Sequence, residues 1–183
     1  IKLAEADGRI TDLNGPGPVI GAVAQQDLLD RLEQIAHGHD AVVVAGSLPR
    51  GVSAQWLHAL VLRLKAKGLR VALDTSGEAL KACLGAGPWL IKPNTEELAE
   101  VLGCAVVSSK AQAEAASRLH AQGIEHVVIS NGAEGVNWFS VSSALHATPP
   151  RVSVASTVGA GDSLLAGMLH GLLSADTPEQ TLR

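Results

Sequence analysis

The stretch AVVVAGSLPRGVSAQWLHALVLRLKAKGLRVALD, residues 41–74, sets the fold class. It opens with the β-branched run Ala41–Ala45, which is typical of a strand buried on both faces of a parallel sheet. Apolar residues then recur at helical spacing through Ala54–Lys67, and Arg70–Leu73 predicts a second strand. A strand, a helix and a strand in this order predict parallel pairing through a right-handed crossover.

The same alternation continues on both sides of this unit. Toward the N-terminus, Asp7-Gly8 is a turn signal between two short strands, and Asn14–Pro18 is a linker. The remaining expected elements are helices at Ala24–Ala36, Glu78–Leu84, Thr95–Leu102, Ala111–Gln122 and Ala160–Leu173, and strands at Lys2–Ala4, Arg9–Leu13, Trp89–Ile91, His126–Ser130 and Val136–Phe139. The pattern predicts an α/β three-layer sandwich with a mostly parallel sheet over residues 19–183, preceded by a hairpin and linker over residues 1–18.

Composition excludes several classes of protein. The chain has 183 residues, a formal net charge of −4 and 17% charged residues, so it lacks the basic excess of a nucleic-acid binder. It shows no apolar run long enough for a membrane span and no signal-peptide pattern. Only Cys83 and Cys104 are present, without a CxxC motif, which favours a reducing, cytoplasmic location.

Both ends of the chain have the character of cut ends. The first residue is Ile1, not Met, and Thr177-Pro178 begins a helix that the last residues leave no room to continue. We therefore expect a fragment of a longer protein.

The strongest chemical motif is Ser156-Thr157-Val158-Gly159-Ala160-Gly161-Asp162, which leads into the long apolar helix. The glycines allow backbone amides to converge, and the helix N-terminus favours anions. Asp162 lies in the first turn, where a carboxylate can accept a proton from a substrate hydroxyl during phosphoryl transfer. The alternative is a plain helix cap built from small residues.

A second motif, Lys92-Pro93-Asn94-Thr95-Glu96-Glu97, follows the short strand at Trp89–Ile91. Asn94 and Glu97 lie three residues apart at a helix start, and their oxygen atoms suit Mg²⁺ bound through water. Lys92 can pair with a phosphate. The alternative for Asn94 and Glu97 is a capping box with no ligand.

Two further loops follow strands. Ser130-Asn131-Gly132-Ala133-Glu134-Gly135 can receive a nucleotide or form a hairpin turn, and Ser47, in the Gly46–Gly51 loop, can contact a substrate or simply connect two elements. Gly46 and Gly51 fit GxxxxG, but Val52 replaces the lysine of a P-loop. HExxH, GxSxG and an early GxGxxG are absent, which disfavours zinc, hydrolase and dinucleotide sites. All these loops are expected to gather at one edge of the sheet.

In order and spacing, these motifs, together with Asp74-Thr75-Ser76-Gly77-Glu78-Ala79-Leu80, resemble the phosphofructokinase B family, a branch of the ribokinase-like sugar kinases. The resemblance covers essentially the whole chain. It implies ATP-dependent, Mg²⁺-assisted phosphorylation of a sugar phosphate, most closely of fructose 1-phosphate to fructose 1,6-bisphosphate. Tagatose 6-phosphate and fructose 6-phosphate are the alternative substrates, and a nucleotide-binding module without catalysis is the alternative for the fragment itself.

The resemblance also implies roles for single residues. Asp162 matches the catalytic base and also contacts the sugar, and Gly159, Ala160 and Gly161 match an anion hole. Asn94 and Glu97 match the Mg²⁺ motif, and Ser47 lies near the sugar phosphate. The ATP site would be lined by Lys92, Ser130, Gly132, Glu134, Gly135, Thr157, Val158, Gly159 and Gly161. The opening hairpin matches part of a lid that covers the sugar and often forms a homodimer. Asn131 departs from the family, which leads us to expect an apolar residue there.

Overall fold

The computed structural model describes residues 2–4, 10–12, 15, 17–151 and 157–182. The strands are β1 (Lys2–Ala4), β2 (Ile10–Asp12), β3 (Ala41–Ala45), β4 (Arg70–Asp74), β5 (Leu90–Ile91), β6 (His126–Ser130), β7 (Val136–Ser140) and β8 (Ala144–Ala147). The helices are α1 (Ala22–Ile35), α2 (Ala54–Ala66), α3 (Gly77–Leu84), α4 (Thr95–Leu102), α5 (Ser109–His120), the 3₁₀ turn η1 (Gly132–Glu134), α6 (Ala160–Leu173) and α7 (Pro178–Thr181).

The main sheet has six strands in the order β3-β4-β5-β6-β7-β8. Neighbouring strands from β3 to β6 are parallel, whereas β6–β7 and β7–β8 are antiparallel. Since β8 runs in the same direction as β6, the carboxyl ends of β3, β4, β5, β6 and β8 all lie at one edge of the sheet, which we call the carboxyl edge. The expected mostly parallel α/β sheet is confirmed.

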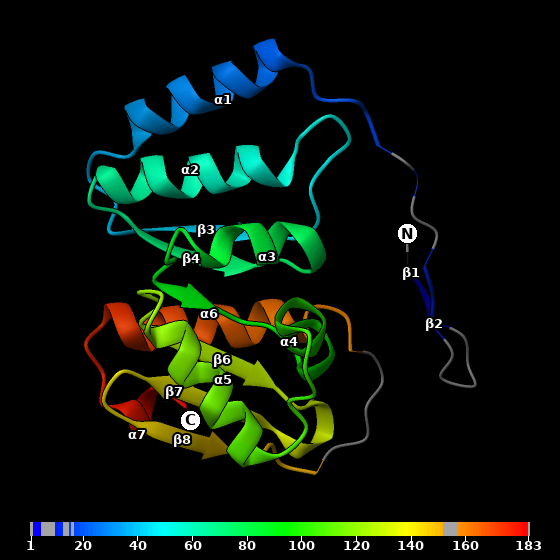
Figure 1. The fold of residues 1–183 in the computed structure, drawn as a ribbon, viewed down its shortest axis with the longest axis vertical. Coiled ribbons are helices and arrows are strands. Elements are labelled where there is room, and N and C mark those ends of the chain that lie inside the picture. The colour runs from blue at the N-terminus through cyan, green and yellow to red at the C-terminus, as the bar shows by residue number, and fades with distance from the viewer. Residues whose placement is uncertain (1, 5–9, 13–14, 16, 152–156, 183) are drawn as a thin grey trace.

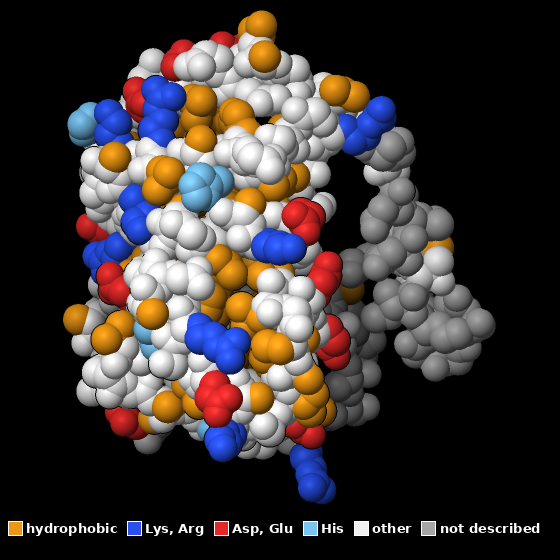
Figure 2. All heavy atoms as spheres, viewed as in Figure 1, with side chains coloured by type: hydrophobic (Ala, Val, Ile, Leu, Met, Phe, Trp, Pro, Cys, Tyr) orange, Lys and Arg blue, Asp and Glu red, His pale blue; other side chains and the backbone are white. Residues whose placement is uncertain are grey.

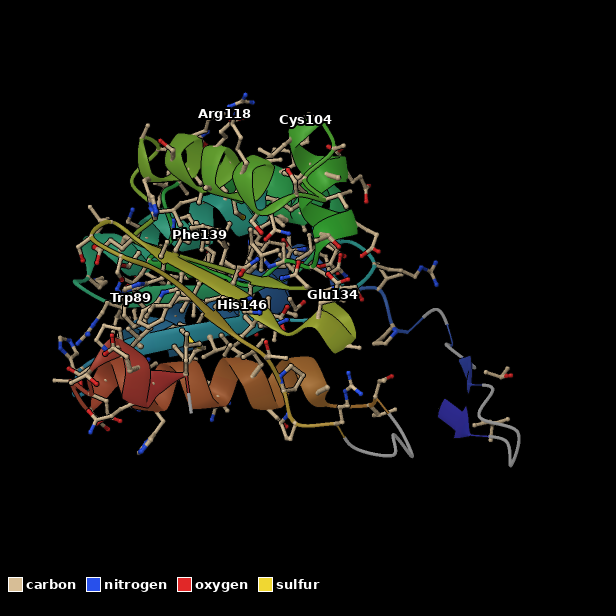
Figure 3. The ribbon with its side chains drawn as sticks, turned by 90° about the horizontal axis from the view of Figure 1, so that it is seen from below. Trp89, Cys104, Arg118, Glu134, Phe139 and His146 are labelled. Atoms are coloured by element: carbon tan, nitrogen blue, oxygen red, sulfur yellow. The ribbon has the colours of Figure 1, made fainter. Side chains whose placement is uncertain are left out.

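Helices cover both faces of the sheet (Figure 3). Alternate residues of each strand point to opposite faces, so Val71 and Leu73 pack with α2–α5 whereas Ala72, between them, packs with α6. Trp138 and Leu165 lie in the α6 layer, in which Met168 is also buried. The three-layer arrangement follows from this alternation, because each strand must bury side chains on both faces.

The hairpin β1–β2 stands apart from the main sheet (Figure 1). Its strands pair antiparallel, with Leu3 opposite Thr11, as the turn signal predicted. The Asp7-Gly8 turn itself lies outside the described residues, as do Asn14 and Pro16 of the predicted linker. The segment leading into α1 is held by two hydrogen bonds, in which the Ile20 amide donates to the Arg50 carbonyl and Gln25 Nε2 donates to the Gly51 carbonyl.

The expected element boundaries agree with the structure to within two residues. The largest differences are α1, which begins at Ala22, and α5, which spans Ser109–His120. In α5 the Ser108 hydroxyl accepts from the Ala111 amide, and this N-cap sets the earlier start. Two elements, β8 and η1, were not predicted. The helix start expected at Thr177-Pro178 is confirmed, because Thr177 is the N-cap of α7.

An aromatic cluster lies at the end of the sheet opposite the carboxyl edge. His126 contacts Trp89 edge-on, and its Nδ1 accepts a hydrogen bond from Trp138 Nε1 at 3.2 Å. The Arg70 guanidinium lies 5.2 Å from the Trp89 ring centre. Burial lowers the pKa of His126 below its usual 6.5. This end of the sheet is a packed surface far from the loops that carry the motifs.

Charges of both signs are interspersed on the face shown in Figure 2, where the described residues form no continuous basic stripe. This agrees with the net charge of −4. Among the described residues, no helix is both long and apolar enough to cross a membrane.

Candidate active site

The start of α6 forms the centre of the candidate site. Gly159 caps the helix with φ +77°, a left-handed conformation that glycine adopts without strain. The Ala160 amide donates to the Thr157 carbonyl and the Ser163 amide donates to the Gly159 carbonyl. For the two amides between them, those of Gly161 and Asp162, the structure records no acceptor among the described residues, and Asp162 is exposed. The first turn therefore offers N–H groups and a carboxylate to an anionic ligand.

Lys92 brings a positive charge to the same place. Its side chain is only 7% exposed, and its Nζ lies 3.1 Å from Asp74 Oδ1 at the end of β4. A Cβ atom on Gly161 would lie 3.2 Å from Lys92 Nζ and 4.0 Å from Asp74 Oδ2. The structure thus places the Lys92 ammonium, the Asp74 carboxylate and the first turn of α6 in contact, although Gly161 lies 69 residues after Lys92 in the chain.

Asn94 and Glu97 form a complete capping box at the start of α4. The Glu97 amide donates to Asn94 Oδ1 at 2.8 Å, and the Asn94 amide donates to Glu97 Oε2 at 2.9 Å. The other carboxylate oxygen of Glu97, Oε1, has no recorded partner among the described residues, and the residue is half-buried. The capping box that the sequence left open as the alternative is therefore present, and it leaves one oxygen for a further ligand.

The loop after β6 is a hairpin turn that carries η1. The Asn131 amide donates to the Gly135 carbonyl, and β6 and β7 pair antiparallel on either side of the turn. Gly135 has φ +102°, and a Cβ there would lie 2.0 Å from the Ala147 carbonyl oxygen, so only glycine fits. Glu134 lies on this turn at the same end of the sheet as the start of α6 (Figure 3).

Asn131, where an apolar residue was expected, has a specific partner. Gln112 on α5 is 2% exposed, and its Nε2 donates to Asn131 Oδ1 at 2.9 Å. Gln112 Oε1 accepts from Asn137 Nδ2, and Asn137 Oδ1 contacts His146 Nδ1 at 2.7 Å. The asparagine therefore completes a buried polar network instead of an apolar contact.

The loops at the carboxyl edge are joined to one another by the backbone. The Gly46 amide donates to the Asp74 carbonyl, the Lys92 amide donates to the Leu73 carbonyl, and the Ser130 amide donates to the Pro93 carbonyl. Ser47 follows Gly46 and is exposed. The structure thus brings the Ser47, Lys92–Glu97 and Ser130–Gly135 loops to one edge of the sheet, as the sequence analysis expected.

Two cavities lie beside this edge and not over it. A cavity of about 450 Å³ is lined by α5, η1, β7 and β8 residues that include Gln112, Glu134 and His146. An apolar cavity of about 490 Å³ lies between α1, α2 and β3. Asp162 lines neither of these two cavities, and its side chain is exposed.

Asp74 and Thr75 also lie at this edge; the sequence analysis named them only within a motif of the family resemblance and gave them no role. The Thr75 hydroxyl is the one buried side-chain polar atom without a partner among the described residues. A buried hydroxyl normally finds a partner, so a water or a ligand group would complete it. The signal in the sequence was a polar run, Asp74-Thr75-Ser76, directly after a strand predicted to end at the carboxyl edge.

A metal ion would not find a complete cage here. Among the described residues, no three His, Cys, Asp or Glu side chains gather in one place. The donors at the carboxyl edge are instead single carboxylate oxygens. Mg²⁺ is commonly bound in this manner, with one or two carboxylates plus water and substrate phosphates. The free Glu97 oxygen fits that type of site.

Comparison with known proteins gives one consistent family. The model of the pfkB family of carbohydrate kinases matches residues 1–183. The 1-phosphofructokinases of Escherichia coli K12 and Vibrio cholerae are 45% and 41% identical over the whole chain, which covers 59% and 58% of their lengths. Phosphofructokinase-2 from Escherichia coli, solved in complex with substrates and products, superposes with a TM-score of 0.90 at 30% identity over 97% of this chain and 58% of that one.

The chain therefore spans a little under three-fifths of these relatives. The family model covers every residue, and the solved structure repeats the fold over nearly the whole chain. The 183 residues belong to the pfkB family of carbohydrate kinases.

Proposed function

We propose that the full-length protein transfers the terminal phosphoryl group of ATP to a sugar phosphate, most closely fructose 1-phosphate, and forms fructose 1,6-bisphosphate. The observation that carries this proposal is the contact between Lys92, Asp74 and the first turn of α6 at the carboxyl edge. The relatives named 1-phosphofructokinase, at 41–45% identity, support this choice of substrate.

In the proposed reaction, Asp162 acts as the general base. The substrate hydroxyl oxygen forms a bond to the terminal phosphorus of ATP, the bond between that phosphorus and the bridging oxygen breaks, and the hydroxyl proton passes to the Asp162 carboxylate. The leaving group is ADP. The exposed position of Asp162 at an N-terminal helix turn suits this role, because the carboxylate can reach a bound substrate.

The anion hole is assigned to Gly159, Ala160 and Gly161. At the α6 N-terminus, the amides of Gly161 and Asp162 have no recorded acceptor among the described residues, so they and the positive end of the helix dipole would face the charge that develops on the phosphoryl oxygens. Lys92 adds an ammonium to the same place. Ser130, Gly132, Glu134 and Gly135, with Thr157 and Val158, would line the nucleotide site, and Ser47 would contact the sugar phosphate.

Mg²⁺, when bound, would neutralise charge on the nucleotide phosphates. Glu97 would hold it through its free oxygen and a water molecule, while Asn94 keeps that carboxylate in place through the capping box.

The hairpin β1–β2 is proposed as part of a lid over the sugar and as a homodimer contact, since it lies apart from the main sheet (Figure 1). Light scattering of the full-length protein, with and without residues 1–18, tests the dimer. A mass that stays the same after this deletion would contradict the hairpin contact.

The function itself is tested by measuring ADP release from ATP with fructose 1-phosphate, fructose 6-phosphate and tagatose 6-phosphate side by side. Fructose 6-phosphate is the second candidate, because a similar structure, phosphofructokinase-2 from Escherichia coli, was solved with it. We expect fructose 1-phosphate to give the highest kcat/KM and Asp162→Asn to lower kcat by about 10²- to 10⁴-fold. ADP release that does not depend on any sugar phosphate, or normal turnover in Asp162→Asn, would refute the proposal.

A further inference from the structure

Asp74 carries a carboxylate that the proposed reaction does not use. It ends β4, and its side chain is 19% exposed. Its Oδ1 lies 3.1 Å from Lys92 Nζ, and in the part of the chain that the structure describes no other side chain is a recorded partner of either group. This pair is the only described ion pair at the carboxyl edge that is largely buried, because the other ion pairs of the described residues lie on exposed side chains.

We propose that Asp74 is a positioning residue that holds the Lys92 ammonium against the first turn of α6, where the transferred phosphoryl group would lie. The inference rests on the proposed function. It assigns to Asp74 no contact with the substrate: the carboxylate acts through the lysine.

The need for such a partner follows from the chemistry of lysine. A lysine side chain has a flexible four-carbon stem and about 2 kcal/mol of rotamer entropy, so an unpaired ammonium would sample many positions. Burial of an unpaired charge is also costly. One short ion pair at the end of a rigid strand supplies both the compensating charge and a fixed direction.

The remaining donors of Lys92 point to a ligand. An ammonium has three N–H donors, and for Lys92 Nζ the described residues provide only the ion pair with Asp74. Lys65 shows the contrast: its Nζ donates to the carbonyls of Ala86 and Gly87, far from the motifs, and it ties two segments together. Within the described part of the chain Lys92 Nζ has no such carbonyl partner, so its N–H donors are available to phosphate oxygens.

The missing side chain of Gly161 is the second feature that places Lys92 against the first turn of α6. A Cβ at this position would lie 3.2 Å from Lys92 Nζ, which is closer than most Cβ contacts, and 3.8 Å from its Cε, an ordinary van der Waals distance. Its absence lets the ammonium approach the amides of the first turn. A simple stabilising pair would not need this contact, and a buried ion pair is seldom a strong source of stability in any case.

The test is a double-mutant cycle in the full-length protein, with kcat and the KM for ATP measured for Asp74→Asn, Lys92→Met and the double variant. We expect Asp74→Asn to lower kcat about 10- to 100-fold with the KM for ATP changed by less than about twofold, because a misplaced group costs transition-state stabilisation more than ground-state binding. In the Lys92→Met background, Asp74→Asn should have no further effect on kcat.

Gly161→Ala probes the same contact without removing the carboxylate. Alanine favours the helix, so the free energy of unfolding should be unchanged or higher, while kcat falls and the fall disappears in the Lys92→Met background. This variant keeps the proposal testable if Asp74→Asn does not fold. The matched control is Glu78→Gln, which removes a carboxylate from the exposed pair with Lys81 and should leave kcat unchanged.

Normal turnover in Asp74→Asn would overturn the role of Asp74. The role would also be overturned if Asp74→Asn lowered kcat by the same factor with Lys92 and with Lys92→Met, because Asp74 would then not act through the lysine. An unsubstituted protein that releases no ADP in the presence of sugar phosphates would instead overturn the proposed function, and this outcome is separate from the other two.

Discussion

Replacing Glu97 with glutamine separates the two roles that the structure allows for this residue. Glutamine still offers a side-chain oxygen to the Asn94 amide, which Glu97 Oε2 now accepts at 2.9 Å. The capping box therefore survives, since glutamine is as common as glutamate at this position. What is lost is one negative charge near a helix N-terminus, which is worth about 0.3–1 kcal/mol of the free energy of unfolding.

The Mg²⁺ requirement should change far more. If the free Glu97 oxygen holds a metal-bound water, we expect the Mg²⁺ concentration that gives half-maximal activity to rise about 10- to 100-fold in Glu97→Gln. The assay is a Mg²⁺ titration of ADP release by the full-length protein, together with urea unfolding of the same samples. Asn94→Ala removes the N-cap side chain itself, so it should lower the free energy of unfolding by about 1 kcal/mol.

Glu96→Gln is the matched control. Glu96 lies in the same first turn of α4 and carries the same charge, but it is exposed and takes no part in the capping box. Its replacement should leave the Mg²⁺ titration unchanged. If Glu97→Gln also titrates like the unsubstituted protein, Glu97 is a helix cap only, and the metal assignment is wrong.

Three further predictions concern stability and reactivity. Because burial lowers the pKa of His126, the unfolded chain binds a proton at this residue more readily than the folded one. The contribution of His126 to the free energy of unfolding should therefore be constant above about pH 6.5 and fall below it. Urea titrations at pH 7.5 and 5.5 should show a smaller fall for His126→Gln than for the unsubstituted protein. Asn131→Leu should lower the free energy of unfolding by about 1–3 kcal/mol, because it leaves the buried Gln112 amide without its acceptor, and a neutral result would contradict the network. Burial raises the pKa of Cys83 to about 11, so a thiol reagent at pH 8 should modify Cys104 alone in the native protein and both thiols in denaturant.

The strands and helices were predictable because local patterns determine them. Ala41–Ala45 is a continuous apolar run and His126–Ser130 contains one at Val127–Ile129, and the helices between them carry apolar faces. β8 was missed because Ala144–Ala147 is short and only alternately half-buried, and it forms through pairing with β7. Such a strand gains its stability from its neighbour and leaves a weak signal in its own sequence.

The site was predictable as a set of loops but not as a set of contacts. The motif at Gly159–Asp162 and the loop at Lys92 each have a local signature, and the parallel strands bring them to one edge. The pair between Asp74 and Lys92 joins the ends of two strands, so no local spacing reveals it. The role of Asn131 could not be predicted for the same reason, because its partner, Gln112, lies on a different element.

A crystal structure of the full-length protein with a non-hydrolysable ATP analogue tests the central claim most directly. We predict that the terminal phosphate lies within hydrogen-bond distance of the Gly161 or Asp162 amide and of Lys92 Nζ. A terminal phosphate bound elsewhere, for example in the cavity beside His146, with the first turn of α6 in contact only with water, would contradict the account.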